Sequence, residues 1–86
     1  MRLEPEETKA IITRLKRANG HLAAVIRMLE EGSECEEALT QLAAVNKAVS
    51  RGGYALVATG LERCLATSGP DGVDTQKLEK LFLAFA

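Results

Sequence analysis

Two cysteines, Cys35 and Cys64, are the residues of this chain whose type and spacing could do specific chemistry. Thiolates bind soft metal ions such as Cu(I), and they exchange sulfur or form disulfides. The two positions are 29 residues apart. At 100° per residue this leaves a rotation of roughly 20°, so both thiols lie on one face of a helix, about 44 Å apart along its axis. They can meet across an antiparallel pair of such helices, where Cys35 of one chain faces Cys64 of the other.

The element that must position the cysteines is a long helix, predicted over about residues 34–67. Ser33 and Glu36 form a capping-box pattern with Ser33 as the N-cap, which places the first cysteine in the first turn. Heptad-like spacing continues through Gly52 and Gly53 without a change of phase, and this favours one continuous helix. The alternative is a helical hairpin that turns at the glycine pair and brings the two thiols together within one chain.

The midpoint between the two cysteines falls between residues 49 and 50, next to the glycine pair. A two-fold axis crossing the helix there would bring Ser50, Gly52 and Gly53 of two chains together. The same axis would place each Cys35 opposite the other chain's Cys64. This symmetry predicts an obligate homodimer with two cross-chain thiol pairs.

Two further helices are predicted beside the long central one, over about residues 5–31 and 74–85. In the first, apolar residues follow the 4-3 spacing of a heptad seam: Ile11, Leu15, Ala18, Leu22, Val25 and Leu29. Gly32 is suited to end this helix, and Asp74 to cap the last one, whose apolar face holds both phenylalanines. Only 3% of the residues are aromatic. The sequence thus predicts an all-α chain of three helices in a single domain, residues 1–86.

Basic residues gather on the first helix and at the middle of the second: Arg14, Lys16, Arg17, Lys47 and Arg51. The whole chain has a net charge of −1, so a site for DNA must be a local patch. Charges on a helix most often form only a solvated face. A homodimer would double the set, and phosphate contacts with DNA are the functional interpretation of these five residues.

The composition argues against several other classes of protein. No general acid or base set accompanies the thiols and no phosphate-binding loop is present, so an enzyme is not predicted. No apolar run approaches the length of a membrane span and no signal peptide is evident, which makes the cytoplasm the expected location. The cysteine spacing matches no structural zinc motif, and no cofactor is obligatory. A helical thiol carrier or interaction module that binds no DNA stays open as the alternative.

Several motifs recur in the order and spacing of a known family. They are Arg14-Leu15-Lys16-Arg17, Gly20, Met28-Leu29-Glu30-Glu31-Gly32, Cys35, Leu39-Thr40-Gln41-Leu42-Ala43-Ala44-Val45 and Gly60-Leu61-Glu62-Arg63-Cys64. Over roughly residues 8–66 they resemble the metal- and thiol-responsive repressors related to the copper-sensitive operon repressor (CsoR/RcnR/FrmR family). The resemblance implies an antiparallel four-helix-bundle dimer and a tetramer made of two dimers. It also implies operator DNA binding without a helix-turn-helix, relieved when an inducer reacts at sensor residues shared between protomers.

The sensor motif departs from the copper-binding pattern at Gly60, where copper sensors of the family carry a histidine ligand. Nickel and cobalt sensors need several histidines, and this chain has one, His21. The remaining cysteine pair resembles the persulfide-sensing, CstR-like branch, in which a disulfide or polysulfide joins two protomers. We therefore expect reactive sulfur or an oxidant as the small inducer, with Cu(I) held by the Cys35 and Cys64 thiolates as the alternative. The roles of His21 and Tyr54 stay open.

Overall fold

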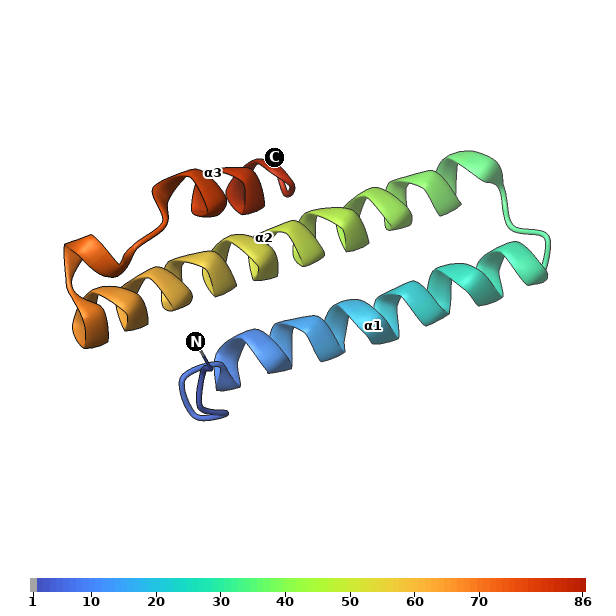
Figure 1. Ribbon diagram of the computed structural model, residues 1–86. Coiled ribbons are helices and arrows are strands. Elements are labelled where there is room, and N and C mark those ends of the chain that lie inside the picture. Colours follow the sequence, from blue (N-terminus) through green and yellow to red (C-terminus); the bar gives the residue numbers. More distant parts are fainter. Residues whose placement is uncertain (1) are drawn as a thin grey trace.

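The computed structural model of the chain describes residues 2–86, and every regular element in that range is helical (Figure 1). The helices are α1 (Lys9–Glu30), α2 (Cys35–Ser68), the short 3-10 helix η1 (Pro70–Gly72) and α3 (Thr75–Leu83). Helices α1 and α2 form an antiparallel hairpin, and α3 folds back along α2 (Figure 1). The all-α fold class with a long central helix is confirmed. Between residues 2 and 86, none of the helices is both long and apolar enough to cross a membrane.

Helix α1 begins at Lys9, four residues later than the sequence predicts. The Thr8 amide donates to the carbonyl of Pro5 at 3.3 Å, an i→i+3 bond that makes a tight turn. The Ile12 amide then donates to the carbonyl of Thr8 at 2.8 Å, with α-helical spacing. Pro5 therefore belongs to a turn that leads into the helix and not to its first turn.

The α1–α2 connection explains why the predicted capping box does not form. Gly32 has φ 80°, and the Ser33 amide donates to the carbonyl of Met28 at 2.8 Å, which together close α1 with a Schellman-type end. This end leaves Glu34, in an extended conformation, as the N-cap of α2, with no side-chain cap hydrogen bond. The prediction of Ser33 as N-cap was wrong because Ser33 already serves the end of α1.

Helix α2 runs without interruption through Gly52 and Gly53, so the hairpin alternative is wrong. Both glycines are buried, and each faces another part of the same chain. A Cβ atom at Gly52 would lie 2.9 Å from Cδ2 of Leu15, and one at Gly53 would lie 2.5 Å from Cδ1 of Phe85. The close approach that the glycine pair permits is therefore made by α1 and by the C-terminal turn. The sequence had suggested a second chain at this position.

Only half of the predicted heptad seam is buried within the chain. The buried apolar side chains are spaced seven residues apart on each helix: Ile11, Ala18 and Val25 on α1, and Ala38 and Val45 on α2. The other half stays 38–58% exposed: Leu15, Leu22 and Leu29 on α1, with Leu42, Val49 and Leu56 on α2. One chain thus presents a continuous apolar stripe on both long helices, which we call the open seam.

Helix α3 is fastened to the middle of α2 by Tyr54. The Tyr54 hydroxyl donates to the backbone carbonyl of Phe85 at 2.7 Å, and its ring centroid lies 4.8 Å from that of Phe82. At the other end of α3, the Asp74 carboxylate accepts from the Lys77 amide at 3.1 Å, so Asp74 is the N-cap that the sequence predicts. A helix of nine residues would be marginal alone, and these contacts hold it in place. This gives Tyr54 a structural role.

Candidate functional site

The two cysteines lie at opposite ends of α2. Cys35 is the first residue of the helix and is exposed, whereas Cys64 lies in its last turns and is half-buried. At 1.5 Å per residue the helix separates them by about 44 Å, so they cannot be bridged within one chain. A contact between Cys35 and Cys64 therefore requires a second chain, and the cross-chain pairing stays a prediction.

Different charges surround the two thiols. Cys35 is followed in the first turn of α2 by Glu36 and Glu37, two acidic residues at the positive end of the helix dipole. Beside Cys64, the Arg63 guanidinium makes an ion pair with the carboxylate of Glu7, which ties the turn before α1 to the end of α2.

Cys64 also lines an apolar cleft of about 750 Å³ between α2 and α3. Gly60, one turn before Cys64, is buried and contributes a wall without a side chain. The apolar side chains in its lining include Leu56, Val57, Val73, Leu78, Leu81 and Phe85. In one chain, counting residues 2–86, no three His, Cys, Asp or Glu side chains lie close enough together to hold a metal ion.

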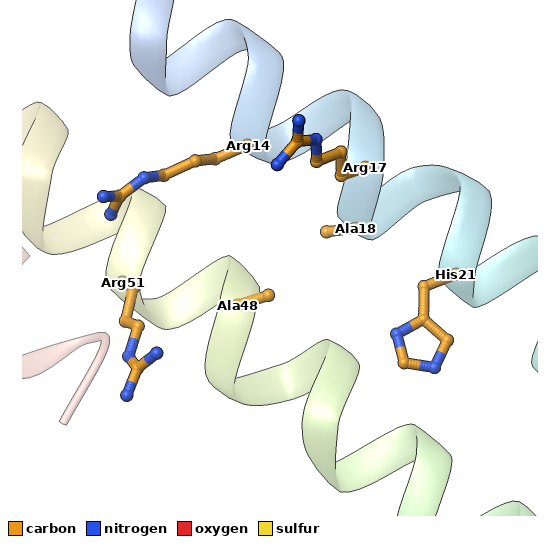
Figure 2. A pocket seen from close by; sticks show the side chains of 6 residues that line it. All are labelled: Arg14, Arg17, Ala18, His21, Ala48 and Arg51. Atoms are coloured by element: carbon orange, nitrogen blue, oxygen red, sulfur yellow. The ribbon is translucent and has the colours of Figure 1, made fainter.

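A second candidate site is a hollow of about 290 Å³ between α1 and α2, lined by cationic side chains (Figure 2). Arg14 and Arg17 come from α1 and Arg51 from α2, and all three are exposed. Two alanines, Ala18 and Ala48, lie between them, and their small side chains leave the space open. Three guanidinium groups from two helices, all lining one hollow, form a surface suited to a phosphate or another oxyanion.

The other two predicted DNA-binding residues lie outside this hollow. Lys16 lines a separate depression near the start of α1, together with Pro5 and Lys9. Lys47 is exposed on α2, one turn before Arg51. The structure therefore gathers three of the five predicted basic residues, and it adds one that the sequence left without a role, His21.

His21 forms one end of the arginine hollow. It projects from α1 toward α2 (Figure 2). Its Nε2 lies 2.7 Å from Oε1 of Gln41, which links the two helices. The sequence held one indication that His21 lies near these arginines. His21 follows Arg14 by seven residues and Arg17 by four, so all three lie on the same face of α1. A single histidine without a known neighbour on α2 could not be assigned from that spacing alone.

Fold and site together define a small helical chain with an arginine-lined hollow between its two long helices, a thiol near each end of its longest helix and an open apolar seam. A family model described as metal-sensitive transcriptional repressor matches residues 7–86. The chain belongs to this family. The family is one of transcriptional repressors and not of enzymes, as the sequence predicts.

Two relatives named as transcriptional repressors agree with this assignment. The chain is 33% identical over 76 residues to the copper-sensing transcriptional repressor CsoR of Mycobacterium ulcerans, covering 88% of this chain and 65% of that protein. It is 33% identical over 73 residues to the protein of the same name from Mycobacterium tuberculosis H37Rv, with 85% and 61% covered. It is also 45% identical over 53 residues to the uncharacterized protein YrkD of Bacillus subtilis, covering 62% of this chain and 84% of that protein. The chain thus spans less than two thirds of the length of the CsoR relatives. No solved structure is significantly similar to it.

Proposed function

We propose that this protein is a transcriptional repressor that binds operator DNA through the arginine hollow and releases it when the cysteines react. The observation that carries the proposal is that Arg14, Arg17 and Arg51 all line one hollow between two helices. A DNA phosphate is the anion that three exposed guanidinium groups at one protein surface would meet in a repressor. Membership of a repressor family supports the same interpretation. Lys47 and Lys16 would add contacts outside the hollow.

The open seam supports assembly of two chains into an antiparallel four-helix bundle. Leucines exposed by 38–58% at seven-residue spacing would be buried against a second copy, as in other helix bundles. An antiparallel arrangement places Cys35 of one protomer near Cys64 of its partner, which cannot happen within one chain. Pairing of two dimers would then repeat the arginine hollow four times along the DNA.

For the inducer we propose a reactive sulfur species such as a polysulfide. A cysteine thiolate attacks a sulfur of the polysulfide, an S–S bond breaks, and the shorter polysulfide anion leaves with the electron pair. The cysteine then carries a persulfide. The thiolate of the cross-chain cysteine attacks the Sγ atom of that persulfide and forms a disulfide, and hydrosulfide leaves. Two thiols are oxidised and one sulfur atom is reduced, so no metal or further oxidant is required. The presence of Gly60, which offers no ligand beside Cys64, favours this chemistry.

Cu(I) is the second candidate inducer, favoured by the relatives named as copper-sensing repressors. The donors fit a soft monovalent ion, because Cys35 and the partner's Cys64 could supply two thiolates. When bound, the ion would supply a bond between protomers that changes their packing. Imidazole is absent at Gly60, so we expect weaker selectivity for copper than three ligands would give.

The test is operator binding with and without each inducer. A duplex selected from a random-sequence library should bind at low salt, and polysulfide should release it from the wild-type protein but not from Cys35→Ala. Release by Cu(I) and not by polysulfide would assign the inducer as copper. No binding of any DNA sequence at low salt would refute the repressor proposal and favour a thiol carrier or an interaction module.

A further inference from the structure

The pairing of His21 with Gln41 determines which ring nitrogen faces the arginine hollow. The Gln41 amide oxygen can only accept a hydrogen bond, so the ring nitrogen 2.7 Å from it, Nε2, carries the hydrogen. The other ring nitrogen, Nδ1, lies on the side of the ring toward Ala48 and the hollow (Figure 2). In the neutral ring with hydrogen on Nε2, Nδ1 carries a lone pair and cannot donate.

This orientation makes the neutral histidine a poor partner for a phosphate. Phosphate oxygens only accept hydrogen bonds, and a lone pair on Nδ1 would face them across the hollow. Adding a proton to Nδ1 turns it into a donor and adds a positive charge next to Arg14, Arg17 and Arg51. These three arginines, from α1 and α2, are the charged groups that line the hollow with His21. A bound phosphate would place negative charge beside the ring and so favour the protonated form.

We propose that His21 is a further phosphate-binding residue, and that the protein takes up a proton at His21 when DNA enters the arginine hollow. The inference rests on the proposed DNA-binding function and adds to it a dependence on pH. Affinity for DNA should rise as pH falls across the range in which histidines change charge. Gln41 is a positioning residue, because it holds the hydrogen on Nε2 and so reserves Nδ1 for the incoming proton.

The experiment measures the dissociation constant of a labelled operator duplex between pH 6.0 and 8.0 at constant ionic strength, because phosphate contacts also depend on salt. The wild-type protein should bind roughly threefold to tenfold more tightly at the lower pH for each His21 that reaches a phosphate. His21→Gln should remove this dependence and bind at all pH values about as weakly as the wild type at pH 8.0. His21→Lys, with a permanent charge, should also lose the dependence but bind tightly throughout.

Gln41→Leu separates positioning from direct binding. Without the amide oxygen, the neutral ring can carry its hydrogen on Nδ1 and donate it to a phosphate, so the variant should bind more tightly than the wild type at pH 8.0 and show a reduced pH dependence. A merely structural role for Gln41 would lower affinity equally at every pH. The inference is overturned if His21→Gln retains the wild-type dependence on pH.

A second measurement keeps the inference independent of DNA binding. The chain has one histidine, so its ring gives one set of NMR signals to follow with pH. Inorganic pyrophosphate should move the midpoint of this titration to higher pH in the wild type, and it should do so less in Arg51→Ala. If no DNA sequence binds, the proposed function fails while this titration still decides whether His21 and the arginines hold a phosphate. An unchanged midpoint with pyrophosphate, in a protein that binds no DNA, overturns the inference as well.

Discussion

The Tyr54 hydroxyl donates a 2.7 Å hydrogen bond to the backbone carbonyl of Phe85, across 31 residues of sequence. This bond joins the last turn of the chain to the middle of α2, one turn after Arg51 of the arginine hollow. The same turn places the Phe85 ring over Gly53 and closes one end of the cleft that Cys64 lines. The C-terminal helix therefore borders the cleft that Cys64 lines.

Removing the Tyr54 hydroxyl should loosen α3 selectively. In Tyr54→Phe the aromatic contacts with Phe82 stay, and one hydrogen bond worth about 1 kcal/mol is removed. The amides of α3 should then exchange with solvent about fivefold faster, while those at the centre of α1 change little. Native-state hydrogen exchange measured by NMR checks this, with Thr59→Val on the same helix as a matched loss of one hydroxyl. Equal acceleration in both variants would contradict the assignment of Tyr54 as the fastening residue.

A methyl group at residue 53 should displace the C-terminal turn. In Gly53→Ala the new Cβ atom would meet three atoms of the Phe85 ring at 2.5–2.7 Å, so the ring must move. Alanine also favours the helix by about 1 kcal/mol over glycine. We therefore expect α2 to keep or gain helicity while α3 detaches. Circular dichroism and limited proteolysis near residues 69–74 measure the two effects separately. Unchanged proteolysis in this segment would show that Phe85 is not held as described.

A charge on the open seam should prevent assembly. Leu22 is 38% exposed in one chain, and its burial against a second copy would bring the Leu22→Glu carboxylate out of water without a partner. The dissociation constant of the dimer should rise about a hundredfold or more. Sedimentation velocity at micromolar concentration measures it. Thr13→Glu, exposed on the opposite side of α1, is the control and should assemble normally.

The two cysteine variants should complement each other. With polysulfide, neither Cys35→Ala nor Cys64→Ala alone should form a covalent dimer, because each lacks one member of every cross-chain pair. A mixture of the two, unfolded and refolded together, should form heterodimers with one bridge each. Non-reducing gels and intact mass measure the product. A covalent dimer formed by Cys64→Ala alone would mean that two Cys35 residues meet, which an antiparallel pair does not allow.

Arg51 and Lys16 should contribute unequally to DNA binding. Arg51→Ala removes a guanidinium from the hollow, so affinity should fall, and the slope of log Kd against log salt should decrease by about 1 for each phosphate that the protein no longer neutralises. Lys16 lines a different depression, and Lys16→Ala should change both quantities less. Fluorescence anisotropy with one duplex at four salt concentrations gives both slopes. Equal effects of the two substitutions would show that the DNA-binding surface is not centred on the hollow.

Periodicity in the sequence predicted where the helices lie better than it predicted which residues pack against one another. The unbroken phase through Gly52 and Gly53 correctly indicated one continuous α2, and Asp74 was correctly predicted to cap α3. The same heptad pattern could not tell which apolar residues pack within the chain. Leu15 and Ala18 both belong to it, yet Ala18 is 4% exposed and Leu15 is 38% exposed.

Interactions between residues distant in sequence account for what was missed. The prediction of Ser33 as the N-cap of α2 was wrong because the Ser33 amide donates to the Met28 carbonyl at the end of α1. His21 lines the hollow with Arg51 and contacts Gln41 because the antiparallel hairpin places α2 beside α1. No spacing in the sequence relates residues 21 and 41. The cysteine pairing between chains stays a prediction, since it depends on a second copy.

The open seam has a consequence for how much folded protein a cell would hold. A chain whose core is buried on one side only gains much of its folding free energy when it meets another copy, so folding and assembly are linked by mass action. We expect its melting temperature to rise with protein concentration. Newly made chains would remain marginally stable, and open to proteolysis, until enough of them had accumulated to pair. The level of the assembled protein would then increase more steeply than the rate of its synthesis.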